Sequence, residues 1–145
     1  MSFREPWNLY EEYPGGMISM SMNTLLHRHT VSFRHALDGV RWALMTQPNF
    51  RIHLLFAAFA LFLSWYLAVS PVEFTVIILT IVLGLSAEMI NTALEAMTDL
   101  ITKEWREEAK IAKDVSAGMM LTVAVGAVIV ACYIFGPKLM TRFLI

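Results

Sequence analysis

The stretch from Pro71 to Leu100 reads PVEFTVIILTIVLGLSAEMINTALEAMTDL, and it decides the fold. Its first half is almost wholly apolar, whereas polar residues recur at regular intervals in its second half. The stretch has 30 residues, so as a helix it is about 45 Å long at about 1.5 Å per residue. Because the hydrocarbon core of a bilayer is only about 30 Å thick, we expect a membrane-spanning helix that continues into the aqueous region on one side.

Four polar residues of this stretch are spaced by three, four and four positions: Glu88, Asn91, Glu95 and Asp99. At about 100° per residue they fall on one narrow face of a helix, here named the polar stripe. If the hydrocarbon core begins near Val72, it ends close to Asn91. A charge inside the core costs about 2.5–3.5 kcal/mol, and such residues are usually functional. The alternative is that the stripe only holds two helices together by polar pairing.

Two more apolar runs accompany this helix. Leu54–Val69 has 16 residues without a charge, and Ala117–Phe135 has 19. With their flanking residues, both approach the ~20 residues that a membrane span requires. The sequence therefore predicts three transmembrane helices in each chain. We place them at about residues 53–70, 72–100 and 116–136, with Gly136-Pro137 ending the third.

Composition supports a membrane protein and excludes several other classes. Hydrophobic residues make up 57% of the chain and charged residues 16%, against about 45–50% and about 25% in soluble domains. A net charge of −1 provides no basic field for nucleic acid, so we expect no nucleic-acid partner. The one cysteine, Cys132, excludes an intrachain disulfide.

The N-terminal region is predicted to be a mobile tail at residues 1–23 followed by a helix at about 24–46. Apolar and charged residues of that helix fall on separate faces, the apolar ones being Phe33, Leu37, Val40 and Leu44. Its charges argue against a span, so we interpret it as an amphipathic helix on the membrane surface. A soluble helix that caps the membrane bundle is the alternative. Gln47-Pro48-Asn49 should end it.

Basic residues predict the orientation of the chain. They precede the first span and lie between the second and third, whereas the hairpin Ser70–Glu73 contains none. By the positive-inside rule, the N-terminus and the second loop face the cytoplasm, and the C-terminus faces outward.

The second loop and the polar stripe together suggest a chemistry. The loop carries carboxylates and cations, with Lys113-Asp114 directly before the third span. Carboxylate oxygens are suitable ligands for Mg²⁺, and Lys or Arg binds phosphate oxygens. The alternative without a binding function is that the loop is a solvated helical turn of mixed charge. The soluble nucleotide-binding motifs GxxxxGK[ST] and GxGxxG are both absent from the sequence.

Two motifs resemble those of a known family. SAEMINTALEAMTDL and EWREEAKIAKDVSAG are similar to the signature of the small bacterial membrane lipid kinases, namely the prokaryotic diacylglycerol kinases and the undecaprenol kinases. The similarity extends from about Ser32 to Lys138 through ALDGVRWA and NFRIH. NFRIH and KIAKD look more like the undecaprenol-kinase branch known from Gram-positive bacteria.

The resemblance implies a homotrimer of three-span protomers with a surface helix, and active sites shared between neighbouring subunits. It implies that ATP and Mg²⁺ bind on the cytoplasmic side of the bacterial inner membrane. By position, Glu88 looks like the catalytic base, Asn91 its polar partner and Glu95 a metal ligand. Residues that resemble nucleotide-binding positions are Glu95, Glu104, Lys113 and Asp114. We assign Arg41 and Glu88 to the lipid-substrate site.

The chain departs from the enterobacterial branch at three points. His53 stands where that branch has a second metal-binding glutamate, so the second metal ligand is open. Trp105-Arg106 replaces a tyrosine–histidine pair, and Ala117 replaces a serine. The lipid is therefore undecaprenol or diacylglycerol, with undecaprenol slightly favoured.

The sequence thus predicts an all-α membrane protein that phosphorylates a lipid hydroxyl with ATP. The alternative function is a non-enzymatic oligomer, such as a proton or cation pathway lined by the polar stripe. A pore predicts polar residues along a whole span, but Thr80 is the only clearly polar residue from Val76 to Leu85. This favours the enzyme.

Overall fold

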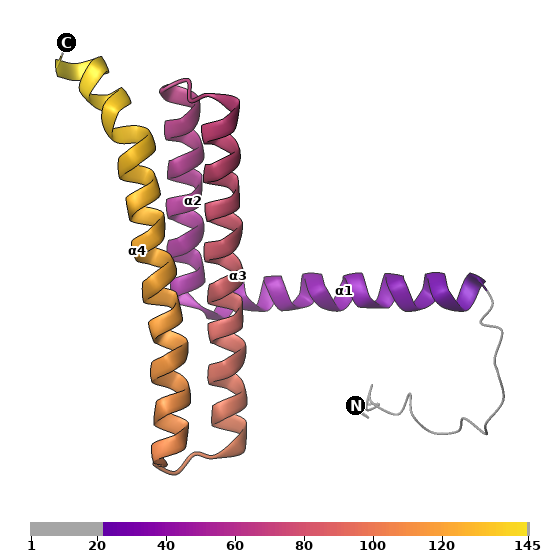
Figure 1. Ribbon diagram of the computed structural model, residues 1–145. Helices are drawn as coiled ribbons and strands as arrows, with labels where there is room; N and C mark the ends of the chain where they lie inside the picture. Colours follow the sequence, from indigo (N-terminus) through magenta and orange to yellow (C-terminus); the bar gives the residue numbers. More distant parts are fainter. Residues whose placement is uncertain (1–21, 145) are drawn as a thin grey trace. The chain divides into compact units, whose positions relative to one another are not determined.

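The computed structural model describes residues 22–144, and the described part is entirely helical (Figure 1). It comprises α1 (Met22–Thr46), α2 (Pro48–Tyr66), α3 (Pro71–Ile101) and α4 (Glu107–Leu144). The chain divides into two units, residues 1–38 and 39–145. The all-α prediction is confirmed. The predicted tail at residues 1–23 lies outside the described residues, except for its last two, which begin α1.

Helix α1 confirms the helix expected at about residues 24–46. All four apolar side chains of its predicted lipid-facing side are exposed, namely Phe33, Leu37, Val40 and Leu44. Exposed apolar side chains suit a helix that lies in a membrane interface. The location of α1 at the membrane surface stays a prediction.

Prolines begin two of the helices. Pro48 and Pro71 occupy first-turn positions of α2 and α3, where a missing N–H costs no hydrogen bond. The break predicted at Gln47-Pro48-Asn49 is confirmed, since α1 ends at Thr46. At α3 the Ser70 hydroxyl accepts from the Glu73 N–H, and the Glu73 carboxylate accepts from the Ser70 N–H at 2.7 Å. This capping box fixes the start of α3.

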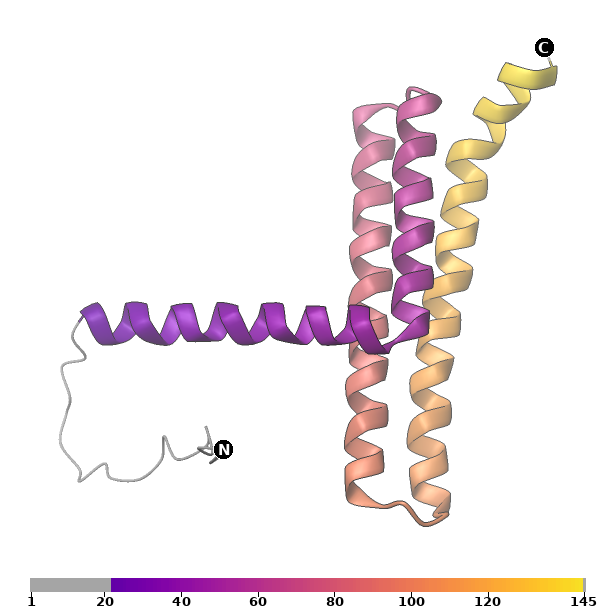
Figure 2. The same ribbon diagram turned by 180° about the vertical axis from the view of Figure 1, so that it is seen from behind.

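Helices α2, α3 and α4 lie side by side in the second unit (Figures 1 and 2). Helix α3 packs mainly against α4, and α2 accompanies only the part of α3 near its N-terminus. The apolar core forms there. Its buried members, here called the apolar cluster, are Leu67, Ile77, Ile134 and Phe135.

The three long helices satisfy the length and hydropathy of membrane spans. They begin and end at positions different from those predicted. Helix α2 starts earlier than expected, and α4 includes most of what the sequence suggested was a loop, leaving only residues 102–106 between α3 and α4. Charged residues at the start of α4 do not prevent helix formation, because Glu107 and Glu108 in its first turn complement the helix dipole.

The prediction that Gly136-Pro137 ends the third span is wrong. Helix α4 continues through Pro137 to Leu144. A proline inside a helix removes one backbone hydrogen bond and bends the helix rather than always ending it. Figure 1 shows the C-terminal part of α4 bending away from α2.

Candidate functional site

The polar stripe of α3 lies against α4, and its first two residues are deeply buried. Glu88 is 3% exposed and Asn91 is 6% exposed. Glu95 is half-buried and Asp99 is exposed, so burial decreases along the stripe towards the end of α3. The sequence-based estimate of membrane depth, which put Glu88 deepest, stays a prediction.

Hydrogen bonds link the middle of the stripe to α4. The Asn91 Nδ2 donates to Glu95 Oε1 at 3.1 Å. On the other side of the amide, the Ser116 hydroxyl of α4 donates to Asn91 Oδ1. Ser116 is 2% exposed. The Asn91 amide is thus held at both ends, and it fixes the Glu95 carboxylate one helical turn away.

An ion pair joins the two helices at the exposed end of the stripe. Lys113 Nζ of α4 lies 2.6 Å from Asp99 Oδ1. Both side chains are largely accessible to water, so this pair contributes little stability. Its effect is to place an ammonium group beside the carboxylates of the stripe.

His53 of α2 and Glu95 of α3 lie within electrostatic range of the Glu88 carboxylate. His53 itself is half-buried. Among the described residues these three side chains do not form a metal-binding cluster, and the assignment of His53 to the metal site stays a prediction.

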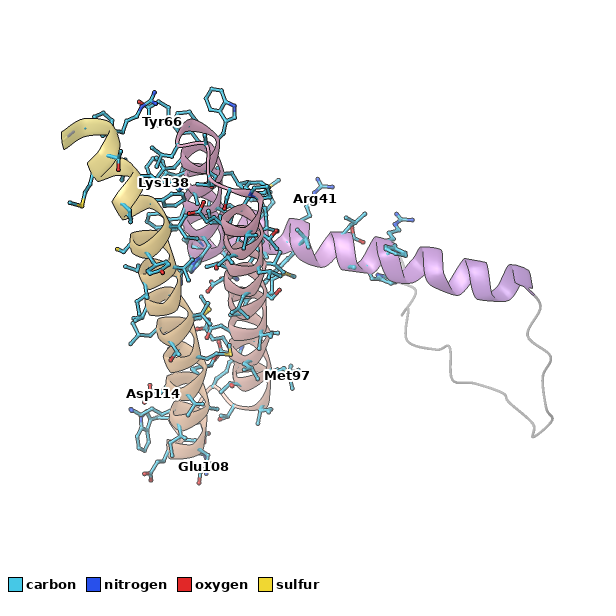
Figure 3. The ribbon with its side chains drawn as sticks, turned by 45° about the horizontal axis from the view of Figure 1, so that its top comes forward. Arg41, Tyr66, Met97, Glu108, Asp114 and Lys138 are labelled. Atoms are coloured by element: carbon cyan, nitrogen blue, oxygen red, sulfur yellow. The ribbon has the colours of Figure 1, made fainter. Side chains whose placement is uncertain are left out.

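Three other predicted site residues lie apart from this group. Asp114 pairs with Lys110 on the same helix, and Figure 3 shows it on the side of α4 away from α3. Glu104 pairs with Arg106 at 3.3 Å in the connecting loop. Arg41 is exposed on α1, and it takes part in none of the ion pairs within the described part of the chain.

A pocket of about 460 Å³ opens where α3 ends and α4 begins. It is lined by Thr98, Thr102, Arg106 and Glu108 together with apolar side chains. The polar lining offers donors and acceptors, and its apolar walls could contact a flat ring. The pocket lies at the end of the α3–α4 pair where Lys113 and Asp99 meet.

The carboxylates suit a magnesium ion better than a transition metal. Among the described residues, no three His, Cys, Asp or Glu side chains converge as a metal cluster. Magnesium needs no such cluster, because it keeps several waters and binds one or two carboxylates plus the phosphates of a substrate. Glu95, fixed by Asn91, offers a carboxylate of this kind.

Sequence reasoning missed the role of Ser116. It interpreted Ser116-Ala117-Gly118 only as small residues that permit close helix packing. A signal was present: Ser116 follows Lys113 by three residues, so both fall on the face of α4 that meets the stripe.

Comparison with known proteins gives consistent results. The profile of the prokaryotic diacylglycerol kinase family matches residues 34–135. A diacylglycerol kinase of Synechocystis sp. is 41% identical over 111 residues, 75% of this chain. An undecaprenol kinase of Bacillus subtilis is 38% identical over 114 residues, 79% of this chain and 93% of that relative. A diacylglycerol kinase of Escherichia coli is 28% identical over 98 residues, 68% of this chain and 80% of that relative. This chain covers only 63% of the length of the Synechocystis diacylglycerol kinase.

Proposed function

The chain belongs to the prokaryotic diacylglycerol kinase family, a family of membrane lipid kinases, and from this premise we propose that it transfers the γ-phosphate of ATP to a lipid hydroxyl. The family match over residues 34–135 carries the proposal. The polar stripe gives it a location, because carboxylates near the bilayer core are costly to bury and usually mark a functional site. The match also favours a kinase over the proton or cation pathway.

Glu88 is the general base in this proposal. The lipid oxygen attacks the γ-phosphorus, its proton passes to the Glu88 carboxylate, and the bond from the γ-phosphorus to the β–γ bridging oxygen breaks to release ADP. A lipid hydroxyl reaches the protein from the headgroup level. The sequence-based depth estimate puts Glu88 at that boundary, and this is why we choose it among the carboxylates of the stripe.

Asn91 and Glu95 hold the nucleotide end of the site. The Ser116–Asn91–Glu95 chain of hydrogen bonds keeps the Glu95 carboxylate in one orientation. Glu95 would hold Mg²⁺, which when bound neutralises charge between the β- and γ-phosphate oxygens. The second ligand is open, and His53 stands at its family position. Lys113 exchanges Asp99 for a phosphate oxygen, and Glu104 and Asp114 contact the rest of the nucleotide.

The lipid acceptor is undecaprenol or diacylglycerol, with undecaprenol slightly favoured by the NFRIH and KIAKD segments. Relatives named for each lipid are similarly identical to this chain, at 41% and 38%. We place Arg41 at the lipid site with Glu88. Its guanidinium would bind a polar group of the lipid at the membrane surface.

The proposed enzyme acts as a homotrimer in the bacterial inner membrane with its N-terminus in the cytoplasm. The distribution of basic residues supports this orientation, and the trimer rests on the family resemblance.

The decisive experiment is a phosphoryl-transfer assay with purified protein, radiolabelled ATP and each lipid separately. We expect label in one lipid at a clearly higher rate than in the other. Label in neither lipid, from well-folded protein in both detergent and bilayer, would contradict the kinase. Proton or cation flux through reconstituted vesicles would then favour the pathway.

A second experiment tests the magnesium site. Glu95→Gln should raise the Mg²⁺ concentration needed for half-maximal activity, because an amide oxygen binds Mg²⁺ more weakly than a carboxylate. His53→Ala measures the contribution of the second ligand, and Glu107→Gln, at an exposed position near the start of α4, is the matched control. An unchanged Mg²⁺ dependence in Glu95→Gln would move the metal site elsewhere.

A further inference from the structure

A second pocket lies at the end of the bundle opposite the exposed end of the polar stripe. It has a volume of about 690 Å³ and is lined by Leu67, Pro137, Lys138, Thr141 and Arg142. Leu67 caps the end of α2, and the other four belong to the last turns of α4. Figure 3 shows Tyr66 and Lys138 at this end and Asp114 and Glu108 at the other.

The bend of α4 leaves room for this pocket. Pro137 lies inside α4, where it removes the hydrogen bond to the carbonyl of Tyr133. Figures 1 and 2 show the helix diverging from α2 beyond this level. The Thr141 hydroxyl donates to the Pro137 carbonyl at 2.9 Å, a contact that often accompanies a bent helix.

The pocket carries unbalanced positive charge. Lys138 Nζ pairs with Glu73 Oε2 at 3.1 Å, and this one partner leaves two of its three donors for other acceptors. The Arg142 guanidinium lies 5.3 Å from the centre of the Tyr66 ring. Within residues 33–143, no ion pair involves Arg142. Its planar fork of five N–H donors matches the geometry of a phosphate.

Neighbouring side chains place the pocket at the level of lipid headgroups. Trp65 and Tyr66 end α2 beside it, and both are exposed. Tyrosine and tryptophan gather at the membrane–water interface. The apolar cluster follows immediately towards the bilayer centre. The outer faces of α2 and α4 carry exposed apolar side chains there, such as Phe62 and Ile129.

From this combination we propose that the pocket binds the phosphate of an anionic phospholipid in the leaflet opposite the proposed active site. Arg142 donates to the two non-bridging phosphate oxygens, and Lys138 donates to one of them while keeping Glu73. The acyl chains then run along α2 and α4. The bound lipid holds the end of α2 to the bent end of α4 without taking part in phosphoryl transfer.

The test is native mass spectrometry of the full chain in detergent micelles with phosphatidylglycerol or phosphatidylcholine of identical acyl chains. We expect phosphatidylglycerol to be retained in preference to phosphatidylcholine. Arg142→Gln should weaken phosphatidylglycerol binding about tenfold, the loss expected for a hydrogen bond to a charged group. Arg142→Lys should bind phosphatidylglycerol with an affinity between those of the unaltered protein and Arg142→Gln. Lys103→Gln removes one exposed charge at the other end of the bundle and should bind like the unaltered protein.

Circular dichroism of each variant confirms that the helices are intact, independently of kinase activity. Equal phosphatidylglycerol binding by Arg142→Gln and Lys103→Gln would overturn the proposal. Equal binding of the two phospholipids would show that the pocket does not recognise negative charge, and would also overturn it. Inorganic phosphate is added as a separate arm. If phosphate alone displaces the lipid at equal concentration, the site takes a free anion and the lipid assignment is wrong.

Discussion

The two ends of the α3–α4 pair are held together by opposite means. Near the N-terminus of α3, the helices meet through Ile77, Ile134 and Phe135, which are buried and apolar. Near its C-terminus, they meet through the hydrogen bond between Ser116 and Asn91 and the ion pair between Lys113 and Asp99. The same two helices thus change from apolar packing at one end to polar contact at the other.

This difference separates stability from chemistry. In lipid, apolar side chains associate through close packing, because lipid tails are as apolar as leucine. Polar contacts between membrane helices contribute about 0.6 kcal/mol on average. We therefore expect substitutions at the apolar end to reduce stability more than activity, and substitutions in the polar stripe to do the reverse.

Replacing the deepest carboxylate should give the largest effect. Glu88→Gln keeps the size of the side chain but removes a general base, so kcat should fall by about 10²–10⁴-fold. The free energy of unfolding should stay the same or rise, because a neutral amide is cheaper to bury than a carboxylate. Steady-state kinetics and unfolding by SDS in mixed micelles measure the two quantities. Near-normal turnover of the variant would show that Glu88 is not the general base. If the variant failed to fold, the role of Glu88 would be structural.

Truncating the apolar cluster should show the opposite balance. Ile134→Ala should lower the free energy of unfolding by about 2 kcal/mol, the low end of the range for core truncations, since the gain from leaving water is absent in lipid. The kcat should change little. The same SDS titration measures the loss. Ile129→Ala, at an exposed position on the same helix, is the control and should be nearly neutral.

Breaking the polar contact should cost less stability. Ser116→Ala leaves the Asn91 Oδ1 without its donor, and we expect a loss of about 1 kcal/mol in the same titration. Activity should fall further than that of Ile134→Ala, because Asn91 no longer holds Glu95 in place. If Ser116→Ala lowered stability more than Ile134→Ala and left kcat unchanged, the polar stripe would serve only to hold the two helices together.

The smallest expected effect is a gain in stability at the end of α2. Ala68 ends α2 with a positive φ of 47°, and its N–H donates to the Trp65 carbonyl while that of Val69 donates to the Ser64 carbonyl. Glycine is the usual residue at this position of the Schellman motif. Ala68→Gly should raise the free energy of unfolding by about 0.5–1 kcal/mol. A loss of stability would mean that the methyl group packs usefully.

Much of the fold was predictable because it depends on local signals. Apolar length identified the three spans, Pro71 marked the start of α3, and Gln47-Pro48-Asn49 marked the end of α1. The predicted helix end at Gly136-Pro137 was wrong for a physical reason. One proline removes only one hydrogen bond, and a long apolar helix in lipid keeps its remaining backbone hydrogen bonds rather than leaving those groups unpaired. The charged start of α4 likewise favoured helix although its composition resembled a loop.

The candidate site was predictable only in part. Spacing put the four residues of the stripe on one face, and the family resemblance is confirmed by the match over residues 34–135. The approach of His53 to Glu88 depends on how α2 packs on α3, which spacing within one helix does not encode. Ser116 was missed for the same reason. The roles of Glu104, Asp114 and Arg41 stay predictions.

The capping box at the start of α3 makes this helix a fixed measure of membrane depth. Glu88 follows Pro71 by 17 residues, which is about 26 Å of rigid helix. With its first turn clamped by Ser70 and Glu73 at one interface, the helix sets the level of the carboxylate near the other. A thicker bilayer would place that carboxylate deeper in hydrocarbon, and a thinner one would place it in water. If Glu88 is the base, as proposed, we expect turnover to depend on acyl-chain length without any contact between the chain ends and the site.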